Sequence, residues 1–169
     1  MRVSATFRTF SVIAVIGVAL LGAGCAKKNA GMDGAGGMAG GVGGVATPGT
    51  SQDFQVNVGD RVFFETDSSA LTPQAQQTLE RQAQWLRQYG NYGFLIEGHA
   101  DERGTREYNI ALGARRANTV RDFMGARGID PRRMRTVSYG KERPVAVCDD
   151  ISCWSQNRRA VTVLDGAGS

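Results

Sequence analysis

One stretch organises this chain: Gly98-His99-Ala100-Asp101-Glu102-Arg103-Gly104-Thr105-Arg106-Glu107-Tyr108-Asn109. An apolar segment, Phe94 to Ile96, precedes it, and a long helical pattern follows it. The turn between them carries an acid, Asp101, and a base, Arg116, follows 15 residues later. We interpret the stretch as a strand, a loop and a helix that together hold a small zwitterion.

The two charges suit the two ends of such a ligand. A guanidinium presents a rigid fork of donors that matches a carboxylate, and the first N–H groups of a helix add anion affinity. Arg116 is therefore the expected partner of a carboxylate, and Asp101 that of an ammonium group. A ligand without one of the charges would leave a partner unpaired, which gives specificity. The turn shows no nucleophile–base pair and no metal-ligand spacing, so we expect a binding site, not an enzyme, with neither metal nor cofactor.

Hydrophobic periodicity predicts one domain over residues 53–165, followed by a tail, 166–169. The order β-α-β-α-β-β predicts an α+β domain with a mixed sheet and helices packed on it. The expected elements are a strand within 54–64, a helix from Thr72-Pro73 to Gly90, a strand at 94–97, a helix from Thr105 to about Met124, a helical turn at Asp130-Pro131, a strand at 135–139, an irregular loop, and a strand at 160–164.

The second helix has a predicted core face rich in small residues, which suggests close packing on the sheet. Asn109 and Arg116 are seven residues apart and share a line just beside that face, roughly 10 Å apart along the helix axis. The face consists of Ile110, Gly113, Ala114, Ala117, Val120 and Met124.

Residues 1–24 have the pattern of an export signal. Arg2 and Arg8 supply a positive region, and an uncharged apolar run from 12 to 21 is shorter than the roughly 20 residues of a membrane span. Small residues lead to Cys25, and the segment resembles a bacterial lipoprotein signal, in which the cysteine is lipidated. Gly22 stands where such signals usually carry Leu. The alternative is a secretory peptide cut near Ala23.

Residues 25–52 are expected to be the lipidated Cys25 and a flexible linker. The segment 30–50 holds nine glycines among 21 residues. Such a segment cannot bury enough apolar surface to offset its loss of chain entropy on folding. As a flexible coil of about 28 residues, the whole linker has a root-mean-square span of roughly 30 Å and a taut limit of about 95 Å. Without Arg2 and Arg8 the chain has 18 basic and 16 acidic residues, scattered rather than clustered, so nucleic acid is not an expected partner.

Several separated motifs resemble the peptidoglycan-binding domain of the OmpA family. They occur in the family's order and span about residues 54–165. The motifs are Gly98-His99-Ala100-Asp101, Tyr108-Asn109, Leu112, Arg116-Ala117, Val120 and Asn157-Arg158-Arg159-Ala160.

The resemblance implies a ligand and a set of site residues. Asp101 and Arg116 would hold the diaminopimelate of the peptidoglycan stem peptide, and Asn109 and the Asn157-Arg158 segment would line the same cleft. His99, the single histidine, is expected beside the cleft as a structural hydrogen-bonding residue. We expect Asp101→Ala and Arg116→Ala each to abolish most binding to cell-wall sacculi while the fold survives.

The resemblance also implies a place in the cell. It implies a lipid-anchored protein on the periplasmic face of the outer membrane, which binds peptidoglycan and the Tol proteins, notably TolB. Its role would be envelope integrity and outer-membrane invagination during cell division. The alternatives are another wall-binding member of the family outside the Tol system, a motility stator component, and a periplasmic wall hydrolase.

Cys148 and Cys153 are five positions apart near the C-terminus. In the oxidising periplasm they could form a disulfide that closes a short loop before Asn157-Arg158. Metal binding by two thiolates alone is a weaker alternative. A redox role is weaker still, because the two-residue spacing of a Cys-x-x-Cys motif is missing.

Overall fold

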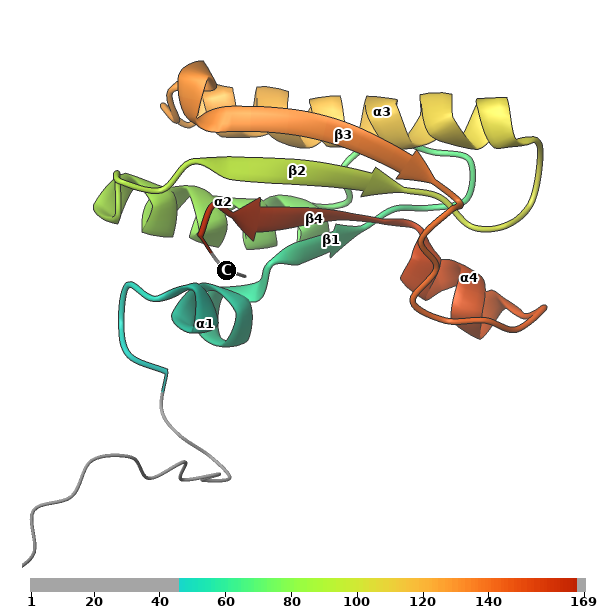
Figure 1. Cartoon of the computed structure of the whole chain (residues 1–169), viewed down its shortest axis with the longest axis horizontal. Helices are drawn as coiled ribbons and strands as arrows, with labels where there is room; N and C mark the ends of the chain where they lie inside the picture. The colour runs from blue at the N-terminus through green and yellow to red at the C-terminus, as the bar shows by residue number, and fades with distance from the viewer. Residues whose placement is uncertain (1–45, 167–169) are drawn as a thin grey trace, which may run out of the picture. The chain divides into compact units, whose positions relative to one another are not determined.

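A four-stranded mixed sheet forms the centre of the domain. The computed structural model describes residues 46–166. The strands are β1 (Arg61–Phe63), β2 (Phe94–His99), β3 (Met134–Gly140) and β4 (Arg159–Leu164), in the order β1-β4-β2-β3. β2 pairs parallel with β3 and antiparallel with β4, which in turn pairs antiparallel with β1 (Figure 1). The prediction of an α+β domain with a mixed sheet is confirmed.

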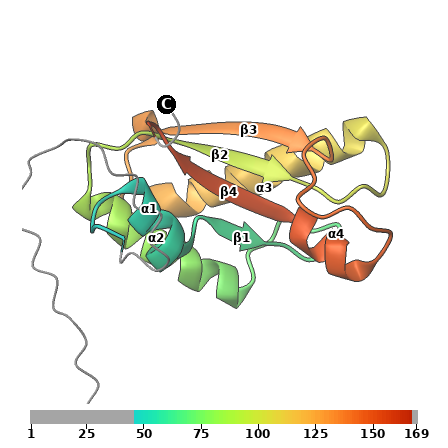
Figure 2. The same cartoon turned by 60° about the horizontal axis from the view of Figure 1, so that its bottom comes forward.

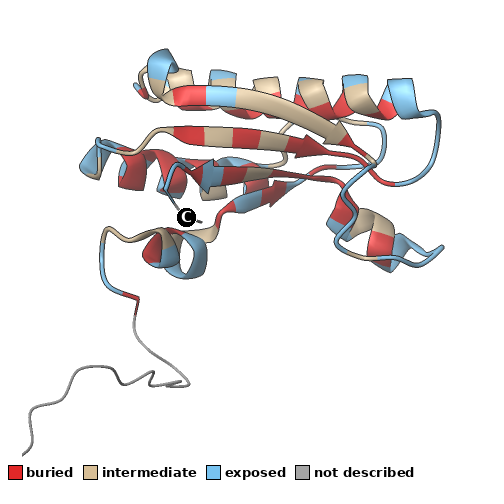
Figure 3. Ribbon diagram, viewed as in Figure 1, coloured by how far each residue is buried: buried red, intermediate tan, exposed pale blue. Residues whose placement is uncertain are grey.

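Two long helices, α2 (Pro73–Gln88) and α3 (Arg106–Ala126), pack on one face of this sheet (Figures 1 and 2). Alternate residues of β2 point toward them, so Phe94 and Ile96 are fully buried. Buried and half-buried residues alternate along the first part of the strand (Figure 3). Apolar side chains of both helices complete the core. They include Leu79, Ala83, Leu86, Ala117, Val120 and Met124.

Both long helices begin where their caps predict. The hydroxyl of Thr72 accepts a hydrogen bond from the Ala75 backbone N–H at 3.1 Å, and that of Thr105 accepts one from Tyr108 at 3.2 Å. Pro73 occupies the first position of α2. The caps set each starting residue within one position of the prediction, and α2 ends at Gln88, two residues before the expected Gly90.

The core face of α3 differs in part from the prediction. Gly113, Ala117, Val120 and Met124 are buried as expected, while Ile110 and Ala114 are half-buried. Asn109, Leu112 and Arg116 are buried instead. Asn109 and Arg116 are polar but face the interior, so a search for hydrophobic residues at helical spacing does not find the buried face of α3 correctly.

At Gly98 the backbones of β2 and α3 come into contact. A Cβ at this position would overlap the Gly113 carbonyl, so no side chain fits between strand and helix. A Cβ at Gly113 would lie 2.8 Å from the Gly98 carbonyl oxygen. This approach confirms the close packing predicted from the small residues of α3.

The strand expected at Phe54 to Val58 is wrong. Residues Ser51–Asp53 form α1, and Phe54–Gly59 form a π-helical turn, η1. Phe54 is buried and Val58 packs against the core, while Val56 between them is 69% exposed. Apolar residues at positions 54 and 58 fit a helical period as well as an alternating one, and a run this short does not separate the two.

The loop expected before the last strand contains a further helix, α4 (Ile151–Asn157). The four strands and two long helices follow the predicted order β-α-β-α-β-β, and α1 with η1 before β1 and α4 before β4 are helical segments that it lacks. A 3-10 turn, Pro131–Arg133, precedes β3 as expected. The Asp150 carboxylate caps α4 by accepting a bond from Ser152 N–H at 2.7 Å. Seven residues with several polar side chains carry little periodic signal, so α4 escaped the prediction.

The segment from Gly49 to Asp53 packs against the C-terminal end of α2 and the residues just after it. The Tyr92 hydroxyl donates to the Gly49 carbonyl at 2.9 Å, and the Trp85 indole N–H donates to the Asp53 carboxylate at 2.8 Å. The segment from residue 49, expected to be the end of the linker, is thus in contact with the domain. None of the helices within residues 46–166 has the length and apolarity needed to cross a membrane.

Candidate ligand-binding site

A cavity of about 260 Å³ lies where β2 ends and α3 begins. It brings together three residues predicted from the sequence: Asp101, Asn109 and Arg116. Two acids and two bases line it, which suits a ligand carrying both signs of charge. The complete lining is Thr66, Asp67, Asp101, Arg103, Gly104, Tyr108, Asn109, Leu112 and Arg116.

Arg116 lies at the buried side of this cavity and is fully covered by the protein. Its Nη1 donates to the His99 carbonyl at 2.7 Å, its Nε to Ser68 at 2.8 Å and its Nη2 to Glu65 at 3.1 Å. Because a guanidinium has five N–H donors, one remains on each terminal nitrogen. Burial, aided by the charge of Arg158, lowers the pKa of Arg116 to about 10, so it is still a cation at neutral pH.

Asp101 supplies negative charge at the same cavity. Arg103 holds its carboxylate through two bonds, Nη2 to Oδ2 at 2.7 Å and Nε to Oδ1 at 3.2 Å. Arg158 Nη1 approaches Oδ2 at 3.3 Å from the protein interior. Burial alone would raise the pKa of Asp101, but the hydrogen bonds from the two arginines lower it overall, so the group is ionised at neutral pH.

Asn109 shapes the turn that presents Asp101. Its side-chain N–H donates to the Arg103 carbonyl at 2.8 Å, and Gly104, the next residue, has a left-handed φ of 87°. A residue with a Cβ is strained in that conformation. The amide therefore acts on the backbone of the turn, and it borders the cavity at the same time.

Asp67 and Tyr108 form a side of the cavity that sequence reasoning missed. The Tyr108 hydroxyl donates to the Asp67 carboxylate, which raises the pKa of the tyrosine. Asp67 has a left-handed φ of 55°, uncommon for a residue other than glycine. The sequence predicted only a turn around Asp67. No local pattern connects Asp67 with Tyr108, 41 positions later.

The His99 ring does not line this cavity. It is 1% exposed and lies beside Tyr139, with ring centroids 5.6 Å apart, and its Nε2 is 3.4 Å from Glu97. Burial, together with the positive charges of Arg159 and Arg143, lowers its pKa to about 4. The residue acts on the site through its backbone carbonyl, which accepts from Arg116.

Asn157 also lies outside the cavity. Its carboxamide oxygen accepts from Val145 N–H at 2.8 Å and Ala146 N–H at 3.2 Å, and its nitrogen donates to the Ala146 carbonyl at 2.8 Å. The side chain thus fastens the loop before α4. Arg158, the next residue, supports the site from behind by binding Asp101 and the Phe64 carbonyl.

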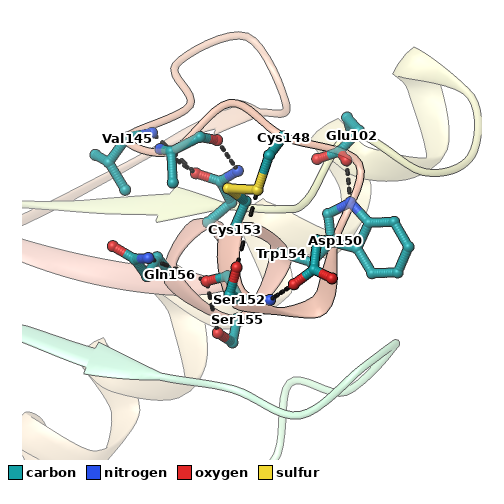
Figure 4. Close-up of a disulfide and its surroundings, with 11 residues drawn as sticks. Glu102, Val145, Cys148, Asp150, Ser152, Cys153, Trp154, Ser155 and Gln156 are labelled. Carbon is teal, nitrogen blue, oxygen red and sulfur yellow. Dashed lines mark hydrogen bonds between the residues drawn. A yellow bond between two sulfur atoms is a disulfide. The ribbon is translucent and has the colours of Figure 1, made fainter.

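A disulfide joins Cys148 to Cys153, whose Cα atoms are 5.7 Å apart (Figure 4). It links the loop before α4 to the first turn of that helix. Cys25, the predicted lipidation site, is outside the described residues. Within residues 46–166 no group of three or more His, Cys, Asp or Glu side chains could hold a metal ion.

Residues 63–158 match the model of the OmpA family. The match spans more than half of the sequence, and the chain therefore belongs to the OmpA family. Within that family it is similar to proteins named Peptidoglycan-associated lipoprotein. The one from Agrobacterium fabrum (strain C58) is 64% identical over 161 residues, 95% of this chain and 90% of the relative. The one from Rhizobium meliloti (strain 1021) is 70% identical over 148 residues, 87% of this chain and 83% of the relative.

Solved structures share the fold. The crystal structure of the peptidoglycan-associated lipoprotein from Burkholderia pseudomallei is 44% identical and has a TM-score of 0.61, covering 62% of this chain and 89% of that one. The C-terminal domain of Helicobacter pylori MotB has a TM-score of 0.58 at 23% identity, covering 62% and 83%. The second likeness is one of fold alone.

Proposed function

We propose that this protein binds peptidoglycan non-covalently, through the diaminopimelate residue of the stem peptide. The observation that carries the proposal is the meeting of Asp101 and Arg116 at one cavity. The free end of diaminopimelate has an ammonium group and a carboxylate on one carbon. A site with fixed charges of both signs matches that pair.

Each charge has a definite partner in this proposal. In this proposal the ligand carboxylate binds Arg116, which lines the cavity and keeps one N–H group on each terminal nitrogen beyond its three bonds to backbone carbonyls. The ammonium group binds the acids of the cavity, Asp101 and Asp67. A stem peptide with lysine in place of diaminopimelate lacks the carboxylate, leaves Arg116 without its partner and binds more weakly.

The similarity to proteins named for peptidoglycan association supports the proposal. In this proposal Cys25 is lipidated, and the protein tethers the outer membrane to the wall from its periplasmic face. The Tol proteins, TolB among them, are its protein partners in envelope integrity and in outer-membrane invagination during division. The protein binds the wall without cleaving it.

The fold suits a tether. The chain enters the domain at α1, near the C-terminal end of α2, and Figures 1 and 2 show the turn between β2 and α3 at the opposite end. α3 alone has 21 residues, about 30 Å of helix. The anchored end and the wall site therefore lie at opposite ends of the domain, and the domain adds its own length to the reach of the linker.

Co-sedimentation with purified sacculi tests the proposal. Asp101→Asn removes the charge, keeps the size and is expected to abolish most binding. Asp122→Asn removes the same charge from an exposed position of α3 and serves as the matched control. Equal pelleting of Asp101→Asn and wild type would contradict the proposed site. Release of soluble wall fragments during the incubation would instead indicate a hydrolase.

Two further measurements test the lipid anchor and the partnership with the Tol proteins separately. The intact mass of protein isolated from membranes shows whether Cys25 carries acyl chains, and a Cys25→Ser variant is expected to leave the membrane fraction. Co-purification with TolB distinguishes a Tol-system protein from a wall-binding family member outside it. An unmodified mass at Cys25 would contradict the lipid anchor and leave wall binding intact.

A further inference from the structure

The carboxylate of Asp101 is fully occupied by the protein itself. A carboxylate has about four acceptor positions. Oδ1 accepts from the Arg103 backbone N–H at 3.3 Å and from its Nε at 3.2 Å. Oδ2 accepts from Arg103 Nη2 at 2.7 Å and from Arg158 Nη1 at 3.3 Å. An incoming ammonium group therefore binds Asp101 only after one of the two guanidinium groups has moved.

Arg103 is the group able to move. Its side chain is 42% exposed and belongs to the turn at the cavity. Arg158 is 6% exposed, and its Nε is also bonded to the Phe64 carbonyl at 3.0 Å in the interior. Displacing Arg158 would leave that carbonyl unpaired, whereas a displaced Arg103 enters water.

We propose that Arg103 is an internal competitor for the ligand's ammonium group and so sets the affinity of the wall site. The inference rests on the proposed function and deepens it. The tethered guanidinium occupies the position that the ammonium needs, so every cationic ligand loses affinity by the same factor. A zwitterion also gains affinity through Arg116, and a cation without a carboxylate does not, so only the zwitterion binds well against this competition.

Trp154 of α4 holds Arg103 in the competing position. The Arg103 guanidinium lies over the Trp154 ring, 4.2 Å from its centroid. The indole N–H of Trp154 donates to Glu102, which belongs to the same turn as Arg103 (Figure 4). Such a stack stabilises the cation where it stands. Trp154 follows Cys153 directly, so the disulfide-linked first turn of α4 positions the ring. The helix thereby contributes to the affinity of a site it does not line.

Calorimetric titration with a soluble disaccharide tripeptide containing diaminopimelate tests this role. Arg103→Gln removes the competing cation and is expected to bind about fivefold more tightly, the range that a partly exposed ion pair allows. Arg106→Gln is the matched control, because it removes an equal charge near the same turn from a residue paired with Glu142. Its dissociation constant is expected to stay within about twofold of wild type.

Two Trp154 variants test the stack. Trp154→Ala is expected to bind about threefold more tightly, while Trp154→Phe keeps an aromatic face and is expected to stay close to wild type. Ligand binding is also expected to change the fluorescence of Trp154 in wild type, because the cation leaves the ring. The change should be missing in Arg103→Gln, and a merely structural role of Arg103 would not remove it.

The outcomes separate this inference from the proposed function. If Arg103→Gln binds as wild type does, or more weakly, Arg103 is not a competitor and the inference is overturned, while wall binding stands. If wild type does not bind the tripeptide, or Asp101→Asn binds it equally well, the proposed function fails and the inference fails with it.

Discussion

Arg116 Nη1 donates to the His99 carbonyl at 2.7 Å, so the last residue of β2 and the middle of α3 are joined by a cation that lines the candidate site. Further bonds from the same guanidinium reach Ser68 and Glu65 in the segment after β1. One side chain thus holds three segments of the chain together and faces the ligand cavity. The proposed binding role of Arg116 and its structural role therefore depend on the same guanidinium.

Arg116→Ala is therefore expected to destabilise the fold as well as to lose the ligand. The variant leaves the buried His99 carbonyl and the part-buried carbonyls of Ser68 and Glu65 without their donor, which costs roughly 3 kcal/mol of unfolding free energy. Urea unfolding measures it, and Arg115→Ala, the exposed neighbour on the same helix, is the control with little effect expected. This replaces the expectation from sequence that the fold survives. Equal stability of the two variants would contradict the structural role.

Gly98→Ala is expected to separate β2 from α3. The added Cβ overlaps the Gly113 carbonyl, and backbone cannot move aside as a flexible side chain can, so a loss of roughly 3 kcal/mol or more is expected. Gly125→Ala in α3 is the control, because its Cβ would have only the Met134 Cε nearby, at 3.9 Å. That variant should gain up to about 1 kcal/mol. Thermal unfolding of both tests the pair, and a tolerated Gly98→Ala would contradict the close packing.

The buried His99 ring predicts a loss of stability in mild acid. Its pKa in the fold is about 4, below the ordinary 6.5, because burial and two nearby arginines disfavour the charged form despite Glu97 at 3.4 Å. Above pH 6.5 the ring is neutral in both states and stability is complete. As the pH falls from 6.5 to 4, only the unfolded chain takes up the proton, so stability declines by about 3 kcal/mol in total.

Urea unfolding at a series of pH values measures this contribution. His99→Phe, which cannot be protonated, is expected to show a flatter dependence between pH 6.5 and 4. The comparison uses the slope for each protein, so a change in overall stability from the substitution does not affect it. Identical slopes for the two proteins would show that another group causes the decline.

The Cys148–Cys153 disulfide is expected to stabilise the α4 region. Closing a loop with a sequence separation of five removes chain entropy worth about 2 kcal/mol in the unfolded state. The Cys148→Ser/Cys153→Ser double variant should unfold at a lower temperature than wild type. A thiol count on the native protein should find neither Cys148 nor Cys153 as a free thiol. Two free thiols in protein from the periplasm would contradict the bridge.

The fold was predictable wherever a local signal specified it. Thr72-Pro73 and Thr105 predicted both helix starts, because a cap satisfies backbone N–H groups only two or three residues away. Phe94 and Ile96 predicted a strand with a buried face. The prediction for residues 54–58 was wrong because two apolar residues do not distinguish a strand from a helical turn. α4 was not predicted because the Asp150 cap and the Trp154–Glu102 contact stabilise it, and neither produces hydrophobic periodicity.

The sequence by itself determined which charges could recognise a zwitterion, because Asp101 and Arg116 belong to one strand–turn–helix unit with motifs of the OmpA family. Only the tertiary structure decided how those charges are held. The burial of Arg116 against three carbonyls and the pairing of Asp101 with Arg158 join segments 17 to 57 residues apart. Contacts of that kind depend on how the chain folds back on itself, and neither periodicity nor spacing encodes them.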